Sequence, residues 1–390
     1  MTQDNTLSPR KPRVVVAMSG GVDSSVAAAL LVDQGYDVVG LMMRLWSEPG
    51  RGSRAPQNRC CTPDQMADAR YIAGLLGIPF YVVDVQDHFR QTIVQFFIDE
   101  HAQGRTPNPC IECNREIRFT YLLNRALALD AAYLATGHYA QVRQTADGRY
   151  QLLKGVDAGK DQSYVLHVLG QGELAHVMFP VGGYSKAQVR ELARHYGLPL
   201  AQKEESMDLC FLGDNDYRRF LREYAPDSAR PGPMLTSDDR EVGRHSGLPF
   251  YTIGQRKGLG LSAAEPLFVL RKDVARNALI VGTRAELGRT TLLAGQVNWV
   301  AGTAPAGAIQ AQVKIRYKAQ PVAATLLPRP GDQVEVAFSE FVYGITAGQG
   351  AVFYDGDVCL GGGIIRENHI VAASDTAEAT RPGGTVGRIL

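Results

Sequence analysis

The sequence lacks long apolar runs and an excess of charge of one sign. No window approaches the roughly 18 apolar residues that a membrane helix needs, and the first residues, MTQDNTLSPRKPR, contain no apolar core of a signal peptide. Lys and Arg number 41 against 40 Asp and Glu. We therefore expect a cytoplasmic protein with no membrane partner, in which local basic patches would have to bind any nucleic acid.

Cysteine is also scarce, with six residues in 390. A chain of this length can bury sizeable cores, and without a secretory signal a disulfide framework is not expected. Spaced thiols in a reducing compartment indicate chemistry instead. For Cys60, Cys61 and Cys359, which do not stand in a C-x-x-C pattern before a helix, we expect simple burial.

The chain divides into two regions with different patterns of apolar and polar residues. In the first half, short apolar runs alternate with helix-favouring stretches, which predicts an α/β domain with a doubly wound parallel sheet. Further on, a helix over 216–225 and a hairpin over 267–282 predict a small mixed domain, and recurring short strands predict an antiparallel β-barrel. The expected units are 1–205, 206–285, 286–372 and a loose tail over 373–390.

Local signals fix several helix boundaries in the first unit. Thr62 is a suitable N-cap and Pro63 a suitable first helical residue, so a helix is predicted to begin at Pro63. We expect a loop over 104–112 and a helix over 114–129.

A glycine-rich stretch, Ser19–Ser24, lies where the first strand meets a helix. Free backbone N–H groups at a helix N-terminus favour an anion, and glycine lets the backbone approach phosphate closely. No G-x-x-x-x-G-K-[ST] motif occurs in the chain, so this is not a Walker A loop. The alternative is a plain glycine turn. The stretch resembles the SGGxDS signature of the PP-loop ATP pyrophosphatases, which cleave ATP between the α and β phosphates.

A second constellation combines Cys110 and Cys113 with the distant Cys210. Three interpretations remain open from the residues: a nucleophile with a persulfide partner, a metal or cluster site, or inert buried thiols. Because thiolates are favoured at helix N-termini, Cys113, just before the helix predicted over 114–129, is well placed to be reactive.

Further motifs give the chain a close resemblance to the tRNA-specific 2-thiouridylase family over nearly its whole length. These motifs are SGGVDSS, GRTPNPCIECNREIRF, ATGHYA, KDQSYVL, ESMDLCFLG, YTIGQRKGLG and GQGAVFYDGDVCLGGGII. The resemblance implies a PP-loop enzyme that uses ATP with Mg²⁺ to adenylate the C2 oxygen of the wobble uridine of tRNA, position 34. It then replaces that oxygen with sulfur and releases AMP and pyrophosphate. The implied partners are tRNA and a sulfur-carrier or persulfide donor protein.

The resemblance also assigns residues. Cys113 would be the nucleophile and Cys210 the persulfide carrier. The ATP site would comprise Ala17, Met18, Ser19, Gly20, Gly21, Val22, Asp23, Ser24, Met43 and Gly137. Asn108, Pro109 and Cys110 would face the target base, which an enzyme must take out of the stack. Contacts to tRNA would come from His138, Lys160, Asp161, Gln162, Arg316, Tyr317 and Gln349. Basic clusters suited to an anionic partner are Arg115/Arg118, Arg218/Arg219/Arg222 and Arg256/Lys257.

One departure from the family pattern bears on mechanism. The family commonly has aspartate where this chain has Cys110. Related tRNA-thiolating PP-loop enzymes hold a [4Fe–4S] cluster on three cysteines, so Cys110, Cys113 and Cys210 are conditional cluster ligands. The persulfide and cluster mechanisms both stay open, and no metal ligand is otherwise assigned. Two rival functions are an amidating PP-loop ligase, which the cysteines disfavour, and a non-catalytic tRNA-binding protein, which the intact Ser19–Ser24 disfavours.

Overall fold

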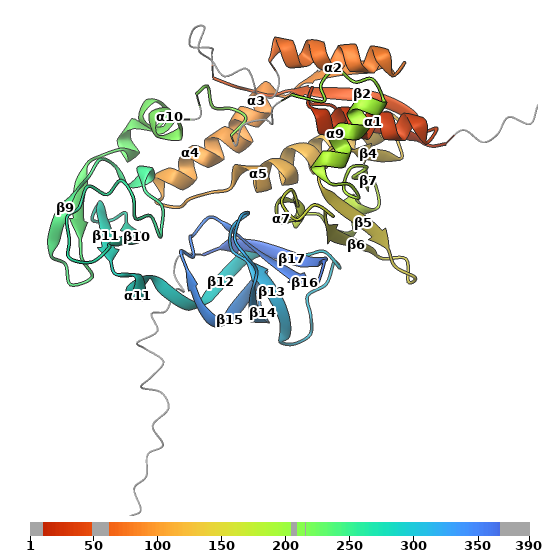
Figure 1. Cartoon of the computed structure of the whole chain (residues 1–390). Coiled ribbons are helices and arrows are strands. Elements are labelled where there is room, and N and C mark those ends of the chain that lie inside the picture. The colour runs from red at the N-terminus through yellow and green to blue at the C-terminus, as the bar shows by residue number, and fades with distance from the viewer. Residues whose placement is uncertain (1–10, 49–61, 204–208, 215, 367–390) are drawn as a thin grey trace, which may run out of the picture.

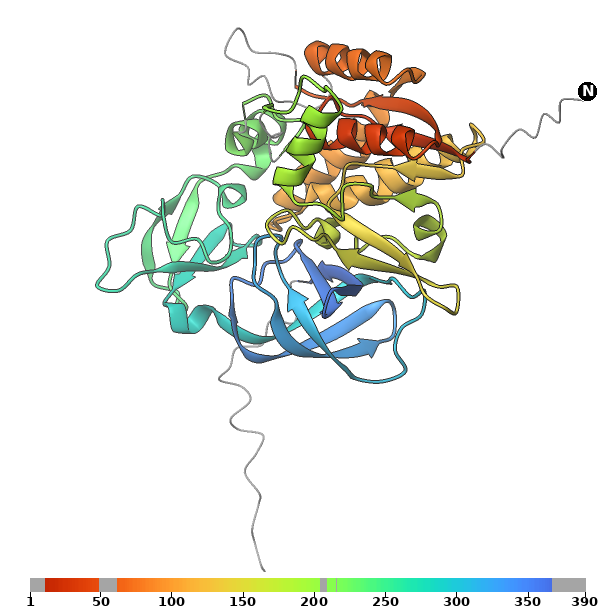
Figure 2. The same cartoon turned by 45° about the vertical axis from the view of Figure 1, so that its right-hand side comes forward.

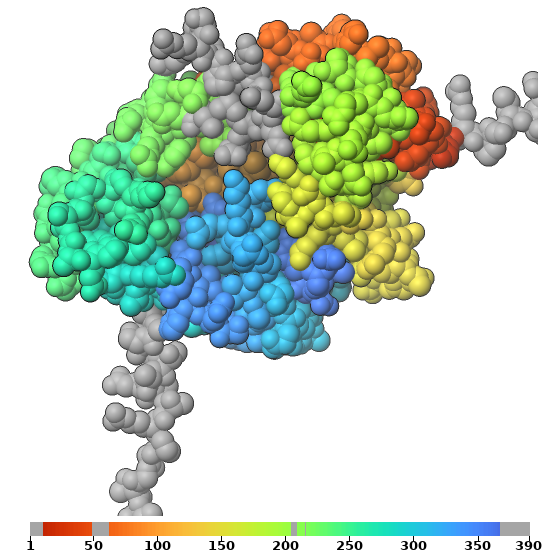
Figure 3. Space-filling model, in the orientation of Figure 1, coloured from red at the N-terminus to blue at the C-terminus, as the bar shows by residue number. Residues whose placement is uncertain are grey.

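The computed structural model describes residues 11–48, 62–203, 209–214 and 216–366. Cys60, Cys61, residues 204–208 and the expected tail over 373–390 lie outside the described residues. Three units follow one another along the chain and pack together, and Figure 3 shows the surface hollowed where they meet. No described helix has the length and apolar character needed to cross a membrane.

The first unit is built on a parallel sheet in the order β3-β2-β1-β4-β7. Val14 and Val16 of β1 pack into the apolar cluster on one face, and Val15 packs into the cluster on the other. Such strands are buried on both sides, as the alternation of strands and helices predicts. The strands are β1 (Arg13–Ala17), β2 (Asp37–Arg44), β3 (Phe80–Asp84), β4 (Tyr133–Ala135) and β7 (Val177–Met178).

Helices cover both faces of this sheet, which confirms the predicted doubly wound fold (Figure 1). One face carries α1 (Val22–Asp33), α2 (Pro63–Leu75) and α9 (Lys186–His195). As predicted, α2 begins at Pro63, and Thr62 Oγ1 accepts a hydrogen bond of 3.2 Å from Gln65 N–H. Further helices are α3 (Gln86–Phe89), η2 (Arg90–Val94), α4 (Gln95–Ala102), α7 (Ser163–Leu166) and α8 (Gln171–Leu174).

The cysteine-bearing helix begins earlier than predicted. Asn108 is its N-cap and accepts a hydrogen bond of 3.1 Å from Cys110 N–H, and Pro109 takes a first-turn position. The expected loop over 104–112 was therefore too long, because an Asn-Pro pair is itself a helix-start signal. The helix continues through α5 (Pro109–Glu112), η3 (Cys113–Leu122) and α6 (Leu123–Leu127).

The middle unit contains the predicted helix, α10 (Tyr217–Tyr224), and a sheet in the order β10-β11-β8-β9. The hairpin predicted over 267–282 is confirmed as β10 (Phe268–Asp273) and β11 (Ala278–Gly282). Its remaining elements are η4 (Pro226–Ser228), β8 (Gly232–Leu235), β9 (Glu241–His245) and η5 (Leu248–Phe250). A short helix, α11 (Arg284–Leu287), leads from it into the last unit.

The last unit is the predicted antiparallel barrel, closed by pairing of β12 with β17. A hairpin of the first unit extends this sheet, because its strand β6 pairs with β17 (Figure 2). The sequence did not reveal this pairing. The hairpin is β5 (Ala140–Gln144) and β6 (Tyr150–Lys154). The barrel strands are β12 (Gly288–Trp299), β13 (Ile309–Lys314), β14 (Val322–Arg329), β15 (Gln333–Tyr343), β16 (Gly350–Asp355) and β17 (Val358–Ile365). Cys359 is buried there, as expected.

Candidate active site

The glycine-rich loop joins β1 to α1 and is held by its own serines. Ser24 Oγ accepts a hydrogen bond of 3.2 Å from Ser19 N–H and donates one of 3.2 Å to the Gly21 carbonyl oxygen. Gly20 has a φ of +72°, and a side chain there would overlap the Gln65 carbonyl oxygen of α2. Glycine is therefore required at this position for both reasons. The loop ends at the N-terminus of a helix of 12 residues, where an anion is favoured.

The other predicted nucleotide-site residues gather at the same edge of the sheet. Gly137 follows β4, and a Cβ there would come within 2.7 Å of Ser24 N, so the turn after β4 lies directly on the start of α1. Met43 lies near the carboxyl end of β2, two residues past Leu41, which pairs with Ala17 at the end of β1. Met18 is buried against Gly40, so its side chain belongs to the core.

Two lysines reach the loop from segments that the sequence did not single out. Lys186, the first residue of α9, donates to both carboxylate oxygens of Asp23 at 2.7 and 2.8 Å. The Tyr139 hydroxyl donates to the same carboxylate at 2.7 Å. Lys203 Nζ donates to the Gly20 carbonyl oxygen at 2.9 Å. The loop is thus flanked by two ammonium groups, each ion-paired with a carboxylate, Lys186 with Asp23 and Lys203 with Asp68. Such groups suit a polyphosphate ligand. No local sequence signal marks them, because both contacts span long stretches of chain.

The two predicted sulfur-handling cysteines are brought to one apolar cluster. Cys113 is buried within it, and Cys210 is half-buried and packs against it. Cys113 lies one turn inside the helix that starts at Pro109, so the expected position just before a helix was wrong. The first-turn position belongs to Cys110, whose side chain is exposed.

The three cysteines do not form a metal-binding group. Across the described ranges, no three His, Cys, Asp or Glu side chains stand in an arrangement that could hold a metal ion. Cys110 is exposed while Cys113 is buried. A cluster held by three thiolates needs all three sulfur atoms directed to one point. The residues present therefore do not fit the conditional [4Fe–4S] cluster.

A buried carboxylate holds the segment that carries Cys210. Glu48 accepts hydrogen bonds from Arg219 at 2.8 and 2.6 Å and from Gly213 N–H at 2.7 Å. The Glu48 N–H donates to the Phe211 carbonyl oxygen at 3.2 Å. Although burial opposes ionisation, these donors hold the pKa of Glu48 below its ordinary value of 4.5. Glu48, which follows β2, thus bonds to the backbone on the C-terminal side of Cys210 and, through Arg219, to the middle unit.

The residues predicted to contact tRNA fall into two groups. Arg316 is exposed, and Lys160 and Tyr317 are half-buried. His138 and Asp161 point inward instead: His138 hydrogen-bonds Thr136 Oγ1 at 2.7 Å, and Asp161 accepts from Gly155 N–H at 3.1 Å.

Contacts inside the protein also engage Gln162 and Gln349, and burial sets the charge of His138. Burial lowers the pKa of His138 to about 3, so its ring is neutral at physiological pH. Gln162 Oε1 accepts from Tyr139 N–H at 3.0 Å, and Gln349 Nε2 donates to the Thr106 carbonyl oxygen at 2.7 Å.

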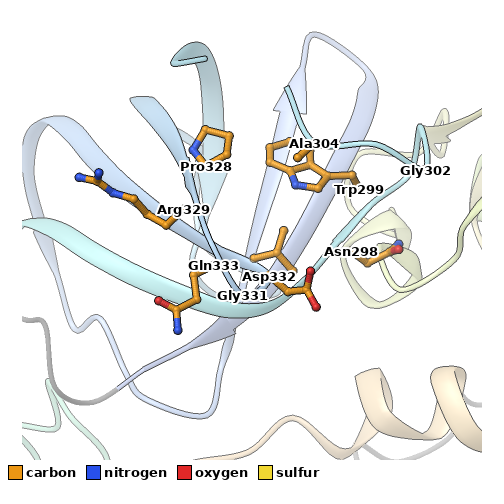
Figure 4. Close-up of a pocket in the computed structure, with 10 residues that line it drawn as sticks. Asn298, Trp299, Gly302, Ala304, Pro328, Arg329, Gly331, Asp332 and Gln333 are labelled. Atoms are coloured by element: carbon orange, nitrogen blue, oxygen red, sulfur yellow. The ribbon is translucent and has the colours of Figure 1, made fainter. Parts of the chain in front are cut away.

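A shallow pocket of about 330 Å³ lies on the barrel, apart from all of these residues (Figure 4). None of the predicted site residues lines it. Its lining comes from the end of β12, the loop that follows it, and the ends and turn of β14 and β15. It comprises Val297, Asn298, Trp299, Gly302, Ala304, Pro328, Arg329, Gly331, Asp332 and Gln333.

Comparison with known proteins covers all three units. A profile described as tRNA methyl transferase HUP domain matches residues 12–214, a tRNA methyl transferase PRC-barrel domain matches 218–283, and an aminomethyltransferase beta-barrel domain matches 289–365. A Roseiflexus castenholzii protein named tRNA-specific 2-thiouridylase MnmA is 48% identical over 90% of this chain and 99% of its own. The chain belongs to the tRNA-specific 2-thiouridylase family. The resemblance inferred from the motifs is confirmed.

Two further relatives of the same name support this assignment. The protein of Chloroflexus aurantiacus is 49% identical, covering 90% of this chain and 98% of its own. The protein of Symbiobacterium thermophilum is 47% identical, covering 94% of this chain and 95% of its own. The family thus extends over the glycine-rich loop, both cysteine motifs and the barrel.

The lysine on Asp23 provides a first test of the nucleotide site. In Lys186→Ala, ATP affinity is expected to fall by roughly 10- to 100-fold, the loss of one charged hydrogen bond of about 1.5 to 3 kcal/mol. Isothermal titration of ATP measures it. Arg194→Ala removes an exposed cation from the last turn of the same helix and should leave the affinity unchanged. Equal affinities in Lys186→Ala and wild type would contradict a role at the phosphates.

The bonds of Glu48 to Arg219 and Gly213 give a test that depends on pH. Because the pKa of Glu48 is lowered in the folded state, its stabilisation is present above pH 4.5 and is lost as the pH falls through the lowered value. Glu48→Gln should therefore unfold more easily than wild type by about 1 to 2 kcal/mol at pH 7.5. This difference should shrink towards pH 3 in denaturant titrations. Glu223→Gln removes another partner of Arg219 but leaves Gly213 bonded, and should cost less. A pH-independent difference would refute the charge effect.

Proposed function

We propose that the protein is a tRNA 2-thiouridylase that adenylates the C2 oxygen of uridine 34 and replaces it with sulfur, with release of AMP and pyrophosphate. Membership of the family makes it a tRNA sulfurtransferase that uses ATP. The observation that carries the finer proposal is the arrangement of Cys113 and Cys210. They come from distant motifs to one cluster, in a chain that also presents a phosphate-binding loop.

The first step requires ATP to lie with its phosphates at the Ser19–Ser24 loop. The uridine O2 attacks the α-phosphorus, the bond between the α and β phosphates breaks, and pyrophosphate leaves. Lys186 and Lys203 would neutralise the charge that develops on pyrophosphate. Mg²⁺ at such sites is held by phosphates and one or two carboxylates. Asp23 is the carboxylate within the loop, and it is already bonded to Lys186.

The second step needs a sulfur nucleophile, because adenylation has turned the oxygen into a good leaving group, AMP. Cys210 would carry a persulfide supplied by a donor protein, and the outer sulfur attacks C2 and displaces AMP. Cys113 thiolate then attacks the Cys210 sulfur, which leaves the outer sulfur on C2 and forms a Cys113–Cys210 disulfide. A thiol reductant restores both cysteines. No step passes through a cluster, because the three cysteines do not fit one.

Substrate docking follows from the placement of the remaining residues. Asn108, Pro109 and Cys110 form the first turn beside the cysteines, where an extruded base would enter. Arg316, Lys160 and Tyr317 remain candidate tRNA contacts, whereas His138, Asp161 and Gln162 support the site from inside.

The products of ATP turnover test the proposal. Wild-type protein with tRNA, ATP and a persulfide donor should yield AMP, pyrophosphate and 2-thiouridine in equal amounts, measured by nucleotide chromatography and nucleoside mass spectrometry. Asp23→Ala should lose AMP and pyrophosphate formation while still binding tRNA. Formation of ADP would overturn the PP-loop assignment. Turnover of ATP without sulfur transfer would favour an amidating ligase, and tRNA binding without turnover would favour a non-catalytic protein.

The cysteine chemistry is tested by three substitutions. Cys113→Ser and Cys210→Ser should each abolish 2-thiouridine formation, because one removes the resolving thiolate and the other the sulfur carrier. Cys110→Ala should retain thiolation in protein freed of iron. Iron and acid-labile sulfide analysis, with absorbance near 400 nm, roughly where thiolate-ligated clusters absorb, checks each preparation. Loss of activity and of iron together in Cys110→Ala would restore the cluster mechanism.

A further inference from the structure

All three units meet at the segment that leads into the cysteine helix. We call residues 104–108 the Thr106 segment and residues 344–349, between β15 and β16, the barrel loop (Figure 1). Thr106 N–H donates to the Ala347 carbonyl oxygen at 3.0 Å. Gln349 Nε2 donates to the Thr106 carbonyl oxygen at 2.7 Å. Both backbone polar groups of Thr106 are therefore satisfied by the barrel loop.

Close backbone packing reinforces these two bonds. Gly348 has a φ of +90°, and a Cβ there would lie 3.1 Å from backbone atoms of Thr106. That contact is tighter than ordinary van der Waals packing, so a side chain at this position would push the two segments apart. A side chain at 348 would therefore be strained by the positive φ and would require the barrel loop and Thr106 to move apart by a few tenths of an ångström.

The middle unit contacts the same segment from another direction. Lys272 of β10 is buried, and its Nζ lies 3.5 Å from Thr106 Oγ1. A Cβ on Gly104 would come within 2.6 Å of Val274, in the turn that follows β10. The Thr106 segment is therefore held between the barrel and the middle unit.

The held segment determines where the target-base residues lie. Asn108 follows Thr106 by two positions, a span of at most about 7 Å, and Asn108 caps the helix that presents Cys110. At the other end of the barrel loop, Arg316 donates to the Tyr343 carbonyl oxygen at 3.1 Å. A residue expected to contact tRNA and the target-base turn are thus attached to opposite ends of one loop.

We propose that Gln349 is a positioning residue that holds the Thr106 segment in the arrangement that thiolation requires. The proposal rests on the function proposed above, and it gives Gln349 a role in coupling the barrel with the target-base turn, beside the tRNA contact that the family resemblance implies. The argument is geometric, since one N–H of the side-chain amide donates to Thr106 inside the protein.

The test separates the catalytic rate from tRNA binding. Gln349→Ala and Gln349→Glu remove the donor to Thr106, and in both the single-turnover thiolation rate should fall roughly 10- to 100-fold, the size that a misplaced reacting group can cost. The rate is measured at saturating tRNA, so that it does not depend on tRNA affinity. Arg316→Ala should instead weaken tRNA binding and flatten the salt dependence by about one unit of log–log slope.

A matched glycine pair controls for backbone effects. Gly348→Ala and Gly331→Ala both place a side chain at a positive φ in the barrel, at +90° and +74°, but a Cβ at Gly331 would have no non-neighbouring atom within 4 Å. Gly348→Ala should reproduce the rate loss of Gln349→Ala, and Gly331→Ala should not.

Alkylation of Cys110 provides a readout that does not depend on the reaction. The rate of iodoacetamide labelling at Cys110, followed by peptide mass spectrometry, should change in Gln349→Ala and Gly348→Ala but not in Gly331→Ala. Weakened tRNA binding with an unchanged rate at saturating tRNA would show that Gln349 acts through tRNA affinity alone and overturn the proposal. Unchanged labelling and unchanged rate would also overturn it. If wild type makes no 2-thiouridine, the proposed function fails, while the labelling still decides whether Gln349 positions the segment.

Discussion

Three phenylalanines from distant segments make the contact on which the arrangement of the site depends. Phe97 of α4 lies 5.4 Å from Phe211 and 6.2 Å from Phe220 of α10, measured between ring centroids. Burying each ring contributes about 2 to 3 kcal/mol, and edge contacts between rings add to it. Because Phe211 follows Cys210 directly, this burial carries the cysteine to the cluster that contains Cys113. The ion pair and hydrogen bonds of Glu48 then hold the backbone after Cys210, which hydrophobic packing has brought close to Cys113.

Different interactions hold the glycine-rich loop, the nucleotide half of the site, and Cys113 with Cys210, the sulfur half. The glycine-rich loop depends on its backbone conformation, because no side chain fits at Gly20 or Gly137. Lys186 balances the charge of its Asp23. The sulfur half depends on side-chain burial and on one ion pair. Several basic residues expected to meet tRNA are used internally: Arg219 bonds Glu48, and Arg115 bonds Glu112. A neutral chain therefore has fewer cations available for RNA than its composition indicates.

Local and repetitive features could be predicted from the sequence. The parallel sheet, the start of α2, the hairpin of the middle unit and the barrel each follow from periodicity or from adjacent capping and turn residues. The motifs also identified the glycine-rich loop and the cysteines. The start of the cysteine helix was missed because Asn108 and Pro109 lie within a stretch that otherwise resembles a loop. Lys186, Glu48 and the Gln349–Thr106 bond could not be predicted, because each joins residues far apart in the sequence.

The strand that the first unit lends to the barrel limits how the chain can be divided. Leu152 and Leu153 of β6 pair with Cys359 and Val358 of β17, so the barrel sheet is completed by a hairpin encoded well before the barrel itself. A fragment ending with the first unit, or one starting at β12, would expose a strand edge that in the whole protein is covered, and exposed edges promote aggregation. A chimera that exchanges barrels between relatives must therefore exchange the hairpin with them.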